Sequence, residues 1–191
     1  LGLCEHLETL IFSNKWEEFD EDNQLWIKYK SQNKEQKNLI AQIHPLLPKN
    51  IKKLIISGNF FNRYQISDIS LLQGLSSLEN LNLSCNQISD YSCLEGLSSL
   101  KSLNISRNKT SDISFLQGLS SLKSLNLSNN IISDITILQG LCNLKSLDLS
   151  HNKISDISFL QGLTSLKSLD LSNNQISDYS CLEGLSSLKS L

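Results

Sequence analysis

Apolar residues recur along most of the chain at a constant interval of 22 residues. The clearest unit opens at Leu78, and the leucine that opens each later unit follows at the same interval: Leu100, Leu122, Leu144, Leu166 and Leu188. Counted from this leucine, the apolar residues of the first unit fall at positions one, four, six, eleven, fourteen, seventeen and twenty. A fixed period of this length predicts a solenoid, in which each unit forms one coil that stacks on the next.

The two halves of a unit predict different local structures. The segment Leu81-Asn82-Leu83 alternates apolar and polar residues, which predicts a short strand with its leucines on one face. From Ile88 to Leu97 the apolar residues come every third position, which favours a tight 3₁₀-like or irregular segment over a long α-helix. A single unit buries too little apolar surface to offset its ordering entropy, so the coils must fold against their neighbours.

Two polar positions are also repeated. An amide side chain both donates and accepts hydrogen bonds, so the asparagine at position nine can satisfy backbone groups at the bend after each strand. This predicted structural asparagine ladder comprises Asn59, Asn86, Asn108, Asn130, Asn152 and Asn174. Position thirteen is an aspartate that precedes a short turn, which suits capping of that turn. The aspartates are Asp68, Asp90, Asp112, Asp134, Asp156 and Asp178.

The repeated pattern resembles the leucine-rich repeat, in the 22-residue subtype shared by bacterial internalins and phosphatase-regulatory leucine-rich repeat proteins. The segment NQISDYSCLEGLSSLKSLNIS, from Asn86 to Ser106, is especially similar to internalin units. The resemblance covers Ile51 to Leu191. It implies an α/β solenoid: a right-handed horseshoe with a parallel concave β-sheet and short 3₁₀ or irregular convex segments. It also implies binding, usually on the concave side, and it implies no particular partner.

The N-terminal quarter departs from the regular frame. Residues 1–50 are interpreted as a degenerate repeat with an aromatic and charged insertion, in which Leu7 and Leu10 match positions one and four. Within the insertion, Leu25 and Ile27 occupy alternate positions, as apolar residues do in a β-strand, and this pattern predicts a projecting β-hairpin. Residues 51–191 are the regular repeats, with a five-residue insertion at 60–64. Since the chain starts at a leucine and stops within a strand pattern, we expect a fragment of a longer protein.

The net charge and the cysteine content restrict the partners and the cellular compartment that we expect. The formal charge of −2 gives no electrostatic reason to expect a nucleic-acid partner, and no apolar run predicts membrane insertion. The five cysteines follow no disulfide-framework spacing, so free thiols and a cytoplasmic location are expected, with the bacterial cell surface as the alternative.

Few residues are arranged as catalysis, metal binding or phosphate binding would require. The three histidines, His6, His44 and His151, fall in different coils, so their spacing supports no pair of nucleophile and base. The acidic segment Asp20 to Asp22 lacks the glycine and distal glutamate of a calcium loop, and no glycine-rich phosphate loop is present. We therefore expect no enzymatic activity, no metal and no cofactor.

Candidate partner-binding residues fall in two places. Aromatic side chains favour binding hot spots, and most of them lie in the N-terminal insertions, where they either pack on each other or form an exposed docking patch. They are Trp16, Phe19, Trp26, Tyr29, Phe60, Phe61 and Tyr64. The side chains of the concave surface are polar and small, and Arg107 and His151 are its larger binding candidates. This surface is either the main binding surface or a sheet that is mostly solvated. The lysines at position two form either a solvated edge or an attractive line for an acidic partner. They are Lys101, Lys123, Lys145, Lys167 and Lys189.

The sequence thus favours a non-catalytic scaffold that binds another protein or a neighbouring domain. One alternative is an internalin-like bacterial surface adhesin, which a signal sequence and a wall anchor in the full gene would favour. Another is the regulatory repeat domain of a Roco-type GTPase, a fold-level analogy that a downstream phosphate loop would favour.

If the aromatic insertions dock the partner, the double substitution of Trp16→Ala with Phe61→Ala should weaken partner binding more than Arg107→Ala does, because large aromatic anchors carry most of the energy of a typical interface. A pull-down with purified variants measures this order. The reverse order would move the binding site to the concave face.

Overall fold

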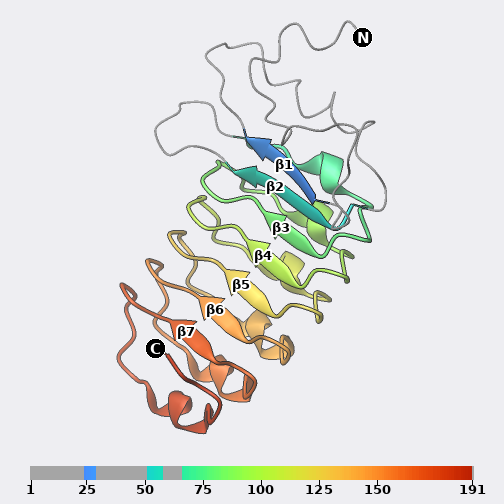
Figure 1. Cartoon of the computed structure of the whole chain (residues 1–191). Coiled ribbons are helices and arrows are strands. Elements are labelled where there is room, and N and C mark those ends of the chain that lie inside the picture. Colours follow the sequence, from blue (N-terminus) through green and yellow to red (C-terminus); the bar gives the residue numbers. More distant parts are fainter. Residues whose placement is uncertain (1–23, 29–50, 58–65, 191) are drawn as a thin grey trace, which may run out of the picture.

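The computed structural model describes residues 24–28, 51–57 and 66–190, with side chains for all of these except 24–28. Seven strands form one parallel sheet in which each strand pairs with its neighbours in the chain, so the sheet order is the sequence order (Figure 1). The strands are β1 (Gln24–Lys28), β2 (Lys53–Ser57), β3 (Asn80–Asn82), β4 (Ser102–Asn104), β5 (Ser124–Asn126), β6 (Ser146–Asp148) and β7 (Ser168–Asp170).

Each coil returns to the next strand through a short 3₁₀ helix. The helices are η3 (Ser70–Leu72), η4 (Ser92–Leu94), η5 (Ser114–Leu116), η6 (Thr136–Gly140), η7 (Ser158–Gly162) and η8 (Ser180–Gly184). The described part of the chain contains no α-helix. The predicted solenoid, with a parallel sheet on one side and short 3₁₀ segments on the other, is confirmed.

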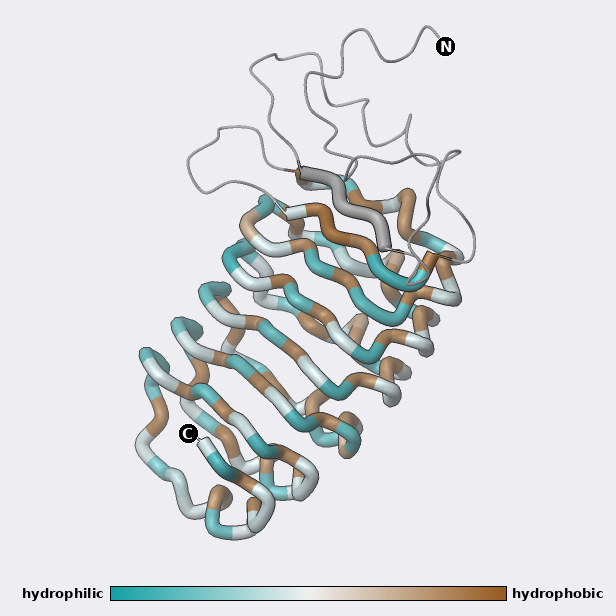
Figure 2. The backbone as a smooth tube through the Cα atoms, in the orientation of Figure 1, coloured by the Kyte–Doolittle hydropathy of each residue, from teal (hydrophilic) through white to brown (hydrophobic). Residues whose placement is uncertain are grey.

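The core is a column of side chains stacked in register between the sheet and the 3₁₀ helices. Position four shows the register: Leu81 pairs with Leu103, which in turn pairs with Leu125. All three are at most 2% exposed. The alternation of hydrophobic and hydrophilic residues along β3 to β7 is visible in Figure 2. Because the register never slips, each apolar position of one coil covers the same position of the next.

The asparagine at position nine joins neighbouring coils at the bend. Nδ2 of Asn130 donates to the carbonyl oxygens of Leu127 (3.0 Å) and Ser128 (3.3 Å) in its own coil and to that of Ile105 (3.1 Å) in the preceding coil. Its Oδ1 accepts from the backbone N–H of Thr110, also in the preceding coil, at 3.2 Å. One side chain therefore satisfies buried backbone groups of two coils at once.

The same set of bonds recurs through the stack. Asn86, Asn108 and Asn152 are at most 8% exposed and bond like Asn130, and Asn174 repeats the bonds in a more exposed setting. The predicted ladder is confirmed for these residues. Asn59 lies outside the described residues.

The aspartates at position thirteen close the turn that leads into each 3₁₀ helix. Oδ1 of Asp112 accepts from the backbone N–H of Ser114 at 2.8 Å, and the other five aspartates of this position make the same bond at 2.8 to 2.9 Å. The turn-capping prediction is confirmed. Thr110, a polar residue at an isoleucine position, is buried because its Oγ1 donates to the carbonyl oxygen of Asp112 at 2.9 Å.

The predicted projecting hairpin is wrong. β1 pairs in parallel with β2, and its register sets Leu25 opposite Leu54 and Ile27 opposite Ile56. β1 is therefore the strand of a solenoid coil. Alternating apolar residues are equally compatible with a hairpin arm and with a stacked strand. The separation between Leu25 and its partner Leu54 is longer than the 22-residue period, so the repeat is not recognisable from spacing there. The remainder of residues 1–50 and the insertion at 60–64 lie outside the described residues, so the proposed domain division stays a prediction.

Replacing Asn130 by alanine should lower the free energy of unfolding by about 3–5 kcal/mol, because it leaves several buried backbone groups without partners at 1–3 kcal/mol each. Chemical denaturation measures the change. The matched control is Asn129→Gly in the adjacent position, where φ is +56° and glycine is tolerated. We expect this control to stay within about 1 kcal/mol of the wild type, and equal losses in both variants would contradict the ladder's role.

Candidate functional site

The outward side of the sheet, here called the strand face, consists of positions three and five of each strand. In β3 to β7 these are Asn80 and Asn82, Ser102 and Asn104, Ser124 and Asn126, Ser146 and Asp148, and Ser168 and Asp170. All are partly or fully exposed. Because the side chains are small, a partner can approach the sheet closely along its whole length.

Position five of the strand face is held in place by its own turn. Oδ1 of Asn126 accepts from both the N–H (2.9 Å) and the hydroxyl (2.8 Å) of Ser128. Asp148 makes the same pair of bonds with Ser150, at 3.0 and 2.7 Å. These side chains lose little conformational entropy on binding, since they are already fixed.

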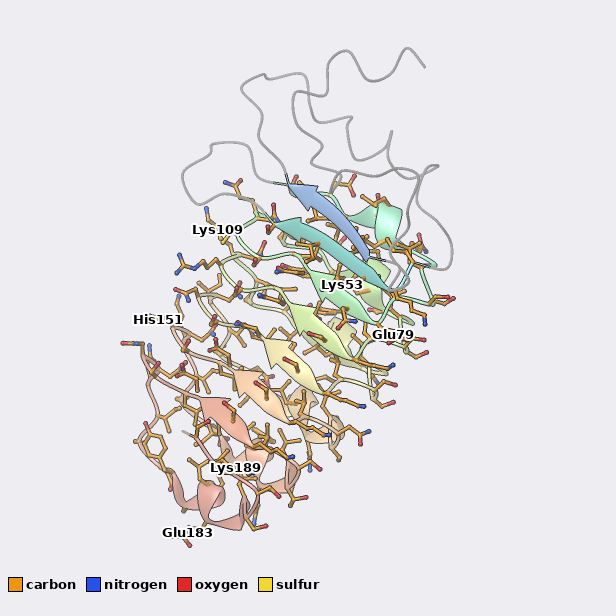
Figure 3. All side chains as sticks on the ribbon, in the orientation of Figure 1. Lys53, Glu79, Lys109, His151, Glu183 and Lys189 are labelled. Carbon is orange, nitrogen blue, oxygen red and sulfur yellow. The ribbon has the colours of Figure 1, made fainter. Side chains whose placement is uncertain are left out.

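The chemical character of the strand face changes along the stack. β2 presents the half-buried Lys53 and Ile55, and Figure 3 marks Lys53 on this strand. β3 to β5 present neutral asparagine and serine, whereas β6 and β7 present Asp148 and Asp170. Trp26 of β1 pairs with Ile55 in the register of the two strands. The face thus runs from an apolar and basic end to an acidic end.

A second row of residues follows the strands at position eight, and we call it the bend row. Every member adopts a left-handed backbone with φ between +55° and +60°. The members are Cys85, Arg107, Asn129, His151 and Asn173. Asparagine accepts this conformation readily, while the other side chains cost about 1 kcal/mol each there. The coil geometry imposes this strain at every repeat.

The bend row brings together two residues that the sequence singled out. Arg107 and His151 are both exposed and lie in the same row, with Asn129 between them. Nδ2 of Asn173 lies 3.1 Å from Nε2 of His151, so the amide donates to the ring when the imidazole proton is on Nδ1. In Figure 3 His151 lies at the end of the strands opposite Glu79. Arg107 and His151 therefore border the strand face on its bend side.

Most of the aromatic candidates fall elsewhere in the chain. Residues outside the described part are Trp16, Phe19, Tyr29, Phe60, Phe61 and Tyr64. Trp26 is placed only by the register of β1. The role of the aromatic patch therefore stays a prediction.

The opposite edge of the strand face carries the lysines of position two, and sequence reasoning missed one member of this edge. Glu79 holds the same position in the coil of Leu78, and its Oε2 accepts from Nζ of Lys101 at 2.6 Å. Counting from Leu78 would have found it, because Glu79 follows the opening leucine as each lysine does.

The thiol of Cys93 is used by the fold. Burial raises the pKa of the Cys93 thiol to about 11, and its Sγ donates to the carbonyl oxygen of Ile69 at 3.2 Å. Cys93 is therefore a packing residue whose thiol stays protonated at neutral pH. In the part of the chain that the structure describes, no three of the histidine, cysteine and acidic side chains come together as metal ligands.

The described residues include no helix with the length and apolar character that crossing a bilayer requires.

Leucine-rich repeat models match most of the chain. A model of two repeat copies matches residues 98–140 and 142–187, and a second leucine-rich repeat model matches residues 49–110. No curated protein matches the chain.

Several solved structures are similar to this one. Internalin C2 of Listeria monocytogenes is 40% identical with a TM-score of 0.69, over 74% of this chain and 61% of that protein. Another Listeria monocytogenes internalin is 32% identical with a TM-score of 0.63, over 80% of this chain and 49% of the other. A leucine-rich repeat protein of Leptospira interrogans is 29% identical with a TM-score of 0.63, over 78% and 40% of the two chains. The chain thus spans less than two thirds of the length of each of these proteins.

Acid should weaken the solenoid through the aspartates at position thirteen. The backbone N–H of the residue two places on, and then its hydroxyl, hold the pKa of these carboxyl groups below the usual value. A lowered folded-state pKa means that the stabilisation is present above the unfolded pKa of about 3.9 and is lost as the pH falls through the folded value.

Urea denaturation between neutral pH and about pH 2.5 measures this loss. The double substitution of Asp134→Asn with Asp156→Asn keeps an oxygen acceptor but removes two titrating groups, so its unfolding free energy should depend less steeply on pH below about 4. An unchanged slope would contradict the assignment.

Proposed function

Since the chain belongs to the leucine-rich repeat family, we propose that it is a non-catalytic scaffold whose strand face docks another protein or a neighbouring domain. The observation that carries this proposal is the strand face itself. Its side chains are small and its position-five groups are held by hydrogen bonds within their own turns. Such a surface resembles a preformed platform, which reduces the entropy that binding must overcome.

The borders of the strand face supply the larger side chains that an interface needs. Ile55 lies on the strand face itself, in β2, while Arg107 and His151 line its bend side. Arginine is enriched in binding hot spots, and larger side chains at the borders of the strand face can contact the sides of a partner that lies on the sheet.

The remaining sides of the coil are less suited to docking. At the turns before the 3₁₀ helices, the aspartates already accept backbone hydrogen bonds. The side of the 3₁₀ helices presents serine and threonine together with longer exposed side chains such as Gln139, Gln161 and Glu183, which lose more conformational entropy when they are fixed by a partner.

A second candidate, an internalin-like bacterial surface adhesin, is favoured by the likeness to internalin C2 at 40% identity. In this candidate the repeat array works outside the bacterial cell and binds its partner with the same strand face. A secretion signal or a wall anchor encoded elsewhere in the full-length gene would support the surface location over the cytoplasmic one.

Bulky substitutions test the strand face directly. Ser124→Tyr with Ser146→Tyr introduces two large side chains at outward positions of β5 and β6, so a partner that rests on the sheet should bind at least about tenfold more weakly. Crosslinking mass spectrometry on lysate first identifies the partner, and titration with the purified partner then measures the affinity.

The matched control is Ser133→Tyr with Ser155→Tyr, at exposed positions of the same two repeats away from the sheet. We expect partner affinity to be unchanged there. A loss in the control pair alone would place the interface on the other side of the coil, and circular dichroism shows that each variant is folded.

A further inference from the structure

The lysines at position two form a continuous line along one edge of the sheet, which we call the lysine row. Its backbone is stacked coil on coil: the N–H of each later lysine donates to the carbonyl oxygen of the lysine in the coil before it, at 2.8 Å in every case. The members are Lys101, Lys123, Lys145, Lys167 and Lys189, and all are exposed. Stacked strands are about 4.8 Å apart, so one positive charge recurs at roughly that interval.

Glu79 occupies position two in the coil before Lys101, and its contacts show how the lysine row interacts with a carboxylate. Nζ of Lys101 lies 2.6 Å from its Oε2, although both side chains are partly exposed. The hydrogen bond from Lys101 is the main cause of a lowered Glu79 pKa, and the charges of Lys101, Lys52 and Lys123 lower it further. A carboxylate placed on this edge is therefore stabilised in its ionised form by several lysines.

The later lysines differ from Lys101 in their surroundings. Among the described residues, no acidic side chain lies within ion-pair distance of Lys123, Lys145, Lys167 or Lys189. The residue directly after Lys123, Lys145 and Lys167 is a neutral serine, so it supplies no negative charge either. These serines are Ser124, Ser146 and Ser168. Like charges stacked at this interval repel one another, so the row gains from any anion that binds along it.

The middle of the row is its most positive part. Position eighteen, on the way back to the strand, carries Glu95 and Glu183 in the units that lead to Lys101 and Lys189. In the units that lead to Lys123, Lys145 and Lys167 this position is glutamine. The chain as a whole carries a formal charge of −2, so any attraction for an anion must be local to the row rather than a property of the net charge.

We propose that the lysine row binds an acidic polypeptide segment of the docked partner, whose carboxylates lie beside Lys123 to Lys167 as Glu79 lies beside Lys101. This deepens the proposed function and rests on it, because the row borders the strand face and one partner can cover both. A peptide is favoured because the one group that the row already holds is a side-chain carboxylate. An extended chain places alternate side chains about 7 Å apart, a spacing that flexible lysines can follow.

The probe is a fluorescein-labelled oligoglutamate of about 12 residues, which spans about 40 Å when extended. Its binding to the 191-residue chain is measured by fluorescence anisotropy at low salt and at about 0.15 M salt. The test variant is Lys145→Gln with Lys167→Gln. Its affinity for the probe should fall about fivefold to tenfold, and its salt dependence should be weaker, because exposed charge pairs each contribute modestly.

The matched control is Lys109→Gln with Lys153→Gln, which removes the same charge from exposed lysines at position ten. Figure 3 shows Lys109 at the end of the strands opposite Glu79. The control affinity should change less than about twofold. Equal losses in both pairs would mean that only net charge matters, and would overturn the proposal.

Two further outcomes would also overturn it. One is a wild-type chain that does not bind oligoglutamate at low salt. The other is tight binding of inorganic polyphosphate, lost in Lys145→Gln with Lys167→Gln, without binding of oligoglutamate, which would assign the row to a phosphate polymer. If oligoglutamate fails while Ser124→Tyr with Ser146→Tyr still abolishes partner binding, the scaffold function stands and the acidic-segment proposal alone fails.

Discussion

The bend after each strand creates the constraint on which the whole molecule depends. Reversing the chain there buries backbone groups that have no partner within a regular strand, and such groups are costly unless they are hydrogen-bonded. One asparagine per coil resolves this by bonding its own coil and the preceding one, as Asn108 does with Ile105 and with Leu83 and Ile88. A coil can therefore be satisfied only when the next coil is in register, which makes the stack cooperative.

Strict register has a functional consequence, because it turns each repeat position into a row. The strand face, the bend row and the lysine row are surfaces that no single coil contains. Their spacing is that of parallel strands, about 4.8 Å, and their side chains are presented in fixed order. Substitution at one position of one coil then changes the surface locally without disturbing the scaffold, provided that the buried asparagines and leucines remain.

Sequence reasoning predicted the periodic features and failed where the period was broken. The asparagine ladder and the turn-closing aspartates follow from residue type and position alone, because their hydrogen bonds lie within one coil or between adjacent coils. The strand at Leu25 to Ile27 was mistaken for a hairpin arm, since its spacing from β2 differs from the repeat. The ion pair between Glu79 and Lys101 required the register between β3 and β4. For the same reason, the candidate docking borders became visible only when the rows were assembled.

Two stretches of identical sequence show where the limit lies. Gln87 to Leu103 and Gln175 to Leu191 match residue for residue. Yet η4 covers only Ser92–Leu94, while η8 extends over Ser180–Gly184. Tyr91 is 3% exposed and stacks on Phe115 of the next coil at 4.9 Å, whereas Tyr179 is 49% exposed.

The sequence by itself determined the period, the identity of each row and the hydrogen-bonding role of its asparagines and aspartates. The tertiary structure decided the length of each 3₁₀ helix and the burial of each repeated tyrosine. The physical reason is that a coil draws its contacts from the coils on both sides, so the same residues fold differently when those neighbours differ.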